Sequence, residues 1–143
     1  MKTLKTTILA LVIVLGLGAA KANTVATKTE KLTVSYAVDT YVNAIVHGKI
    51  DGLNDIIDNN AKFSILRGKE VLSFNKADEM AFVKANKNIE LDCTTQTSIS
   101  QTNADFTVVK IDMKFKDFTR SNYVTMANTG NGWKITSIYS VFK

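Results

Sequence analysis

The sequence predicts an α+β domain in which helices lie on one side of a curved antiparallel sheet. Apolar residues recur with a helical period in the first third of the domain. In the second half, apolar and polar residues alternate with the two-residue period of long strands. The order along the chain is two helices, a hairpin, a third helix and then a run of strands, which is typical of α+β domains. A long, bent sheet around helices leaves a cone-shaped interior, and such interiors hold ligands.

The N-terminus has the pattern of a cleaved secretory signal. Lys2 and Lys5 precede the apolar run of residues 8–18, and residues 20–22 form an A-x-A cleavage site. The apolar run is well short of the ~20 residues that a membrane-spanning helix needs. We therefore expect residues 1–22 to be removed and the chain to be exported to the periplasm or the extracellular space.

The composition of the remaining chain argues against several classes of function. Loss of three signal lysines lowers the formal net charge from +5 to +2, so "KFKDFTR" at residues 114–120 is expected to be a solvated strand face and not a nucleic-acid site. The chain has one histidine and one cysteine, so no metal site and no cofactor are expected. Cys93 is expected to be a packed, inert thiol.

Residues 23–31 are polar and are expected to form a flexible leader, so the domain itself covers residues 32–143. From Val34 the apolar side chains form one helical stripe, and Gly48 follows its last residue, as in helices that end in a left-handed glycine. His47 then lies in the last turn, where it meets the negative end of the helix dipole. We interpret this histidine as a helix cap, with catalysis or ligand binding as the alternative.

The next elements are marked by turn and capping residues. A short second helix is expected in "DGLNDIID", residues 51–58, followed by a hairpin that turns at residues 67–69. Asn75 is a plausible N-cap with Asp78 three residues later, so a third helix should run over residues 76–85.

The C-terminal half alternates as long strands. "IELDCTTQTSIS" (89–100), "ADFTVVKIDMKFKDF" (104–118), "RSNYVTMA" (120–127) and "WKITSIYSVFK" (133–143) are expected to form antiparallel strands, with "NTGNG" as the last turn. The second strand changes phase at Val108-Val109, which predicts a bulge that bends it.

The combination of "YVNAIVHGKIDGLNDIID" with the terminal "NGWKITSIYSVFK" resembles the nuclear transport factor 2-like superfamily, which has a cystatin-like fold. Within it, the chain is most similar to short exported proteins described as "putative lumazine-binding", relatives of the SnoaL-like and ketosteroid isomerase-like proteins. The resemblance covers residues 32–143 and implies a cone-shaped α+β domain, often dimeric. The superfamily includes isomerases, dehydratases, ligand binders and interaction modules, so fold alone does not select a function.

No catalytic residue is predicted. Ketosteroid isomerase-like relatives need an inward carboxylate and an oxyanion donor, but the strand phases place Glu90, Asp92 and Asp112 on the outer face. A tyrosine or an inward-turned His47 would have to act in their place.

The interior is therefore predicted to be an apolar, aromatic-lined pocket for a small, flat ligand. By phase, its candidates are Tyr41, Ile45, Phe63, Ile65, Phe82, Thr95, Thr97, Trp133 and Tyr139. The last strands are apolar on both faces, which predicts a homodimer through the outer face of the sheet. The interface candidates are Val124, Met126, Ile138 and Phe142.

Three functions remain open from sequence. The first is an exported small-ligand-binding or accessory protein without catalysis. The second is a ketosteroid isomerase- or dehydratase-like enzyme, and the third is a homodimeric interaction module whose cone is filled.

Overall fold

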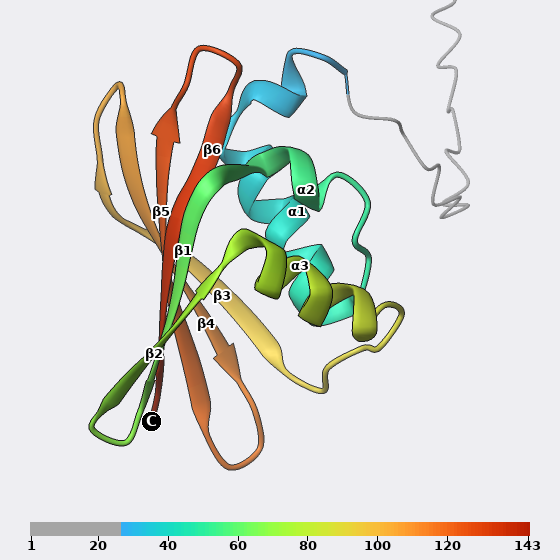
Figure 1. Cartoon of the computed structure of the whole chain (residues 1–143), viewed down its shortest axis with the longest axis vertical. Coiled ribbons are helices and arrows are strands. Elements are labelled where there is room, and N and C mark those ends of the chain that lie inside the picture. Colours follow the sequence, from blue (N-terminus) through green and yellow to red (C-terminus); the bar gives the residue numbers. More distant parts are fainter. Residues whose placement is uncertain (1–26) are drawn as a thin grey trace, which may run out of the picture.

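A computed structural model describes residues 27–143 and shows helices packed on one face of a six-stranded, curved sheet (Figure 1). The predicted signal and the start of the leader lie outside the described residues, and Glu30–Leu32, at the end of the leader, form a 3₁₀ turn. The helices are α1 (Val34–His47), α2 (Leu53–Ile56) and α3 (Lys76–Ala85). The strands are β1 (Ile57–Arg67), β2 (Glu70–Asn75), β3 (Thr94–Thr102), β4 (Phe106–Lys114), β5 (Thr119–Asn128) and β6 (Trp133–Phe142).

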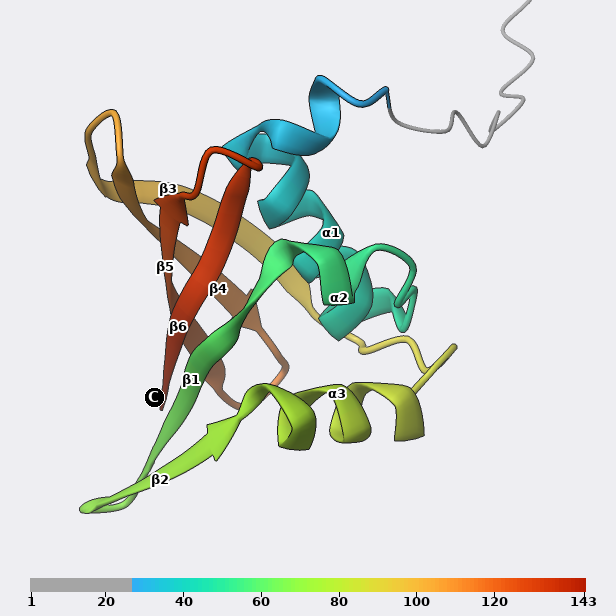
Figure 2. The ribbon, with the colours of Figure 1, turned by 45° about the horizontal axis from the view of Figure 1, so that its top comes forward.

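The strand order is β2-β1-β6-β5-β4-β3. All neighbouring pairs are antiparallel except β1 and β6, which are parallel, a pairing that the sequence analysis did not anticipate. α3 follows β2 at one edge of the sheet, and Figure 2 shows that it lies beside β1 and β2, below α1 and α2. The end of the sheet that carries β2 therefore has its own helical wall.

The bounds of α3 and the position of the hairpin turn agree with the sequence prediction, whereas α2 is shorter than the predicted stretch because β1 already begins at Ile57. α3 begins at a capping box in which the Asn75 side chain accepts from the Asp78 N–H and Asp78 accepts from the Asn75 N–H. The hairpin turns through Gly68, whose φ is +63°. β3, however, begins only at Thr94, so residues 89–93 do not belong to the strand.

Two bulges set the phases of the strands. The predicted break at Val108-Val109 does not interrupt β4, where buried and less buried residues alternate throughout; the extra residue is Ser100 on β3. A second bulge lies at Thr136 on β6, because Met126 pairs with Ile135 while Thr125 pairs with Ser137. Ile135 and Ile138 therefore both face the helices.

The second bulge overturns the predicted interface. Val124, Met126 and Ile138 are buried on the helix-covered face, and Phe142 lies on that face too because it pairs with Arg120 and lines a hollow there. Tyr139, predicted to point inward, is on the opposite face and 38% exposed. The sequence phase was wrong here because a single extra residue inverts every side chain that follows.

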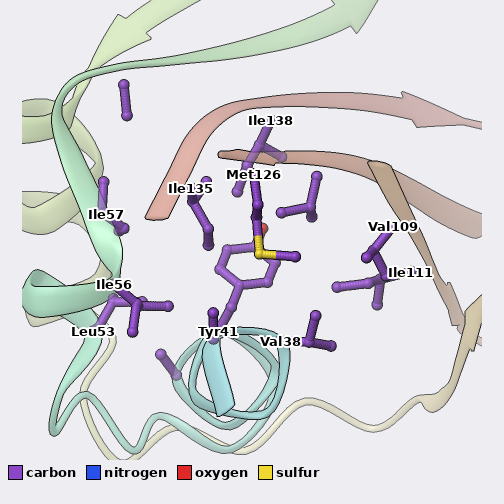
Figure 3. Packing of buried hydrophobic residues seen from close by; sticks show 14 of the residues in the cluster. Val38, Tyr41, Leu53, Ile56, Ile57, Val109, Ile111, Met126, Ile135 and Ile138 are labelled. Carbon is purple, nitrogen blue, oxygen red and sulfur yellow. The ribbon is translucent and has the colours of Figure 1, made fainter. Parts of the chain in front are cut away.

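The core forms where α1 crosses the sheet (Figure 3). Tyr41 projects from α1 towards Met126, Ile135 and Ile138, and Val38 faces Val109 of β4. These side chains are almost fully buried, so the middle of the cone is a packed core. No helix among residues 27–143 is long and apolar enough to cross a membrane.

The end of α1 is fixed by a glycine, as predicted. Gly48 is the left-handed C-cap, with φ +63°, and its carbonyl accepts from the Asn88 N–H. A Cβ on Gly48 would lie 2.5 Å from the Asn88 nitrogen. Both the backbone conformation and the close approach of the chain after α3 therefore require glycine at this position.

We predict that Gly48→Ala destabilises the protein far more than Gly68→Ala, although both glycines have φ +63°. Gly68 has no atom within 4 Å of a Cβ, so its change should cost only the left-handed strain, about 1 kcal/mol. Gly48→Ala should cost at least about 2 kcal/mol more because backbone must move. Urea unfolding of both variants measures this, and equal losses would contradict the packing role of Gly48.

Candidate functional site

A hollow of about 470 Å³ lies between α3 and the concave face of the sheet. Its apolar walls come from Ile65 on β1, Phe74 on β2 and Phe82 on α3, and its charged groups include Glu79 and Arg120. Phe82 is 59% exposed and forms part of the mouth. Ile65 and Phe74 also line an adjoining open depression over the β1–β2 hairpin, which continues to Phe142.

Arg120 is the cation on the sheet side of this hollow. Its Nε donates to the Asn122 Oδ1 at 3.0 Å, and its Nη2 donates to the Ser140 Oγ at 3.3 Å. Its guanidinium carbon lies 5.8 Å from the centre of the Phe142 ring, within the range of a cation–π contact. The half-buried guanidinium is therefore held by two hydrogen bonds and one aromatic face.

Asn122 connects the arginine to the core. This fully buried amide accepts from Ser140 Oγ at 2.7 Å, and its Nδ2 donates to the Tyr41 hydroxyl at 2.9 Å. Burial raises the pKa of Tyr41, which stays a neutral phenol at any physiological pH. The four side chains form a polar network at the point where the packed core meets the hollow.

Glu79 brings a carboxyl group to the same hollow from α3. Burial raises its pKa, and the positive charge of Arg120 opposes that effect only in part. The strand phases predicted no inward acid, and Glu79 lies on a helix, where those phases do not apply. Glu79 follows Asp78 in the first turn of α3, and nothing in the helical pattern distinguishes it from a solvated residue.

The predicted pocket residues fall into separate regions. Ile65 and Phe82 line the hollow, and Tyr41 and Phe63 lie below it around a void of about 20 Å³. Ile45 and Trp133 pack against the core, with Trp133 at the far end of β6. Thr95 and Thr97 are exposed on the edge strand β3, and Tyr139 faces outward, so these three do not reach the hollow.

Five residues in or beside the hollow were not predicted from the sequence: Phe74, Glu79, Arg120, Asn122 and Ser140. Phe142 was predicted, but on the outer face. Arg120 and Asn122 alternate with Ser121 on β5, so the strand period could have placed them on one face. The burial of Val124 and Met126 on the same side of β5 shows that this face is the inner one.

Other candidate groups lie away from the hollow. His47 Nδ1 is 3.1 Å from Glu90 Oε1 on the surface, and α1 ends with this residue as predicted. Cys93 is partly buried, and burial raises the pKa of its thiol. Asp112 is on the outer face, where a hydrogen bond from Ser121 lowers its pKa. Residues 27–143 hold no cluster of metal-ligating side chains.

Comparison with known proteins identifies the family. Residues 29–140 match the family described as "Putative lumazine-binding". The chain belongs to this family. No curated protein matches the sequence.

Solved structures show that the chain has a nuclear transport factor 2-like fold. An NTF-2 like protein of unknown function from Silicibacter pomeroyi has a TM-score of 0.62 and 19% identity over 82% of this chain and 98% of its own. A cystatin-like fold protein from Burkholderia xenovorans has a TM-score of 0.60 and 17% identity over 76% of this chain and 88% of its own. A ketosteroid isomerase-like protein from Erwinia carotovora has a TM-score of 0.54 and 15% identity over 76% of this chain and 92% of its own. At these identities the likeness concerns the fold alone.

This member of the family described as "Putative lumazine-binding" should depend on its buried phenol for stability. We predict that Tyr41→Phe costs about 1 to 3 kcal/mol, because it leaves the buried Asn122 amide without an acceptor. Tyr139→Phe is the matched control: it removes the hydroxyl of a 38%-exposed tyrosine and should change stability by less than ~0.5 kcal/mol. Thermal unfolding of both variants makes the comparison, and an equal effect would contradict the network.

Proposed function

We propose that the protein is a small-ligand-binding protein and that its ligand lies in the hollow between α3 and the sheet. The observation that carries the proposal is the combination of three apolar side chains, Ile65, Phe74 and Phe82, with the anchored Arg120 in one concavity. Ligand sites are typically concave and mostly apolar, with a few fixed polar groups. Membership of the family described as "Putative lumazine-binding" supports the same conclusion.

The geometry favours binding over the isomerase- or dehydratase-like alternative. The Tyr41 hydroxyl, the best candidate for an oxyanion donor, is held by Asn122 below the hollow. The void beside Tyr41 measures about 20 Å³, room for about one water-sized group. Tyr41 and Glu79 both line this void, but it is too small for a substrate ring, so a substrate in the hollow would meet Glu79 without reaching the phenol.

The filled-cone alternative describes only the middle of the molecule. The core around Tyr41 is closely packed, yet the end of the cone beside α3 stays open. Phe74 and Phe82, which are 38% and 59% exposed, both line that opening, and apolar side chains exposed together mark ligand grooves.

We predict that N-phenyl-1-naphthylamine, a neutral flat fluorescent probe, binds saturably with a blue-shifted emission. Phe82→Ala should weaken binding about three- to tenfold, the equivalent of one aromatic contact, without loss of stability because Phe82 lies outside the buried core. Ile99→Ala, at a similarly exposed site on β3, should bind like the wild type. Absence of saturable binding would contradict the proposal.

We also propose that binding takes place outside the cytoplasm, because residues 1–22 have the pattern of a cleaved signal. The mature chain would then begin at Asn23. An intact-mass measurement on protein purified from its own cell envelope checks this, and a mass that retains residues 1–22 would contradict export.

The homodimer proposal now rests on different residues from those of the sequence prediction. The helices of the described chain cover one face of the sheet, and Tyr123 and Tyr139 pair side by side on the other (Figure 1). We propose that a second copy packs there through a self-complementary patch. Tyr139→Lys should convert a sedimenting dimer to a monomer, Ile99→Lys should not, and a monomeric wild type at micromolar concentration would contradict the proposal.

A further inference from the structure

Among residues 27–143, no carboxylate oxygen lies within 4.0 Å of the Arg120 guanidinium. The ion pairs of that region, within 4.0 Å, are His47–Glu90 and Lys110–Asp112. The two acceptors of the guanidinium, Asn122 and Ser140, are both neutral. A guanidinium has five N–H groups, so three remain for another acceptor. A half-buried, unpaired cation beside a cavity is a site for an anion.

The guanidinium is also positioned in advance. Asn122 and Ser140 fix its edge, and Asn122 is itself held by the buried Tyr41. Because these groups are ordered before a ligand arrives, the entropy cost of forming a charge-assisted hydrogen bond is small. A planar guanidinium in a fixed orientation matches the two oxygens of a carboxylate.

Two acidic side chains face the hollow from α3 and must be reconciled with an anion. Asp78 lies at the exposed start of the helix, where its carboxylate accepts from the Asn75 N–H in the capping box. Glu79 lies deeper and faces Arg120. From the sheet and from α1, the other titratable groups around Glu79 are Arg120 and the neutral Tyr41 phenol. Protonation of Glu79 would therefore leave Arg120 as the charged group in the deep part of the hollow.

We propose that the ligand is a flat molecule with a carboxylate, which pairs with Arg120 while Glu79 takes up a proton. The inference rests on the proposed function and adds the chemical class of the ligand. The ring would lie among Ile65, Phe74 and Phe82, and the neutral Glu79 carboxyl could donate a hydrogen bond to the bound anion. Burial already raises the pKa of Glu79, and a bound anion would raise it further.

The test uses the mature protein and three probes of equal shape: 2-naphthoate, 2-naphthamide and 2-naphthylmethylammonium. Calorimetry at pH 5.5 should show 2-naphthoate binding about tenfold more tightly than the amide, or better, as expected for a charge-assisted pair. Its affinity should fall with rising pH, because burial raises the pKa of Glu79 and the ionised carboxylate then repels the bound anion. The affinity of the amide should change little with pH.

Variants separate the two charged groups. Arg120→Gln should abolish the preference for 2-naphthoate, and retained amide binding would show that the hollow is intact. Arg67→Gln removes the same charge from an exposed residue that lines the adjoining depression but not the hollow, and it should leave the preference unchanged. Glu79→Gln should keep tight 2-naphthoate binding at pH 8 and remove the pH dependence.

Other results would overturn the inference in distinguishable ways. Equal affinity for the carboxylate and the amide would refute the anion site while leaving the hollow as a ligand site. Tightest binding of the ammonium would show that Glu79 and Asp78 dominate. Failure of all three probes, together with failure of N-phenyl-1-naphthylamine, would refute the proposed function itself.

Discussion

The arrangement of the interior depends on one extra residue in β6. Thr136 forms a bulge opposite Thr125 and Met126, so Ile135 and Ile138 both face the helices. Without it, the C-terminal half of β6 would present Tyr139 to the core and turn Ser140 and Phe142 outward. The bulge therefore gives the cone its apolar middle and also supplies the serine and the phenylalanine that hold Arg120. Bulges commonly re-aim side chains in this way beside functional sites.

The interior divides into a dry region and a polar end, and Asn122 joins them. On one side of Asn122, Tyr41 extends through the aliphatic core (Figure 3). On the other side, Arg120 reaches the hollow beside α3. A fully buried amide is tolerated only when its hydrogen-bonding groups have partners, and here both its oxygen and its nitrogen have them. The stability of the core and the position of the guanidinium are thus coupled through one side chain.

The sequence predicted the elements whose signals are local and failed where the phase depends on tertiary structure. The end of α1 at Gly48 and the capping box at Asn75 were correct, because glycine conformation and N-capping depend on a few neighbouring residues. The sequence assigned Tyr139 to the wrong face, and it did the same for the predicted interface residues Val124, Met126 and Ile138. The bulge that inverts β6 has no glycine or proline to mark it. Arg120 was read as part of a charged run, and Glu79 was not singled out within the predicted third helix. Their roles appear only when α3 and β5 are brought to opposite sides of one hollow.

The central claim is that the functional site lies at the end of the cone beside α3, and not in the middle of the cone or on the outer face. The most direct test is an NMR titration of the isotope-labelled mature chain with 2-naphthoate, followed through the backbone amides and the methyl groups. We expect the shifts and intermolecular contacts to centre on Ile65, Phe74, Phe82 and Arg120, with Trp133 and Tyr139 unaffected. Contacts centred on Trp133, Tyr139 or the edge strand β3 would contradict this location of the site.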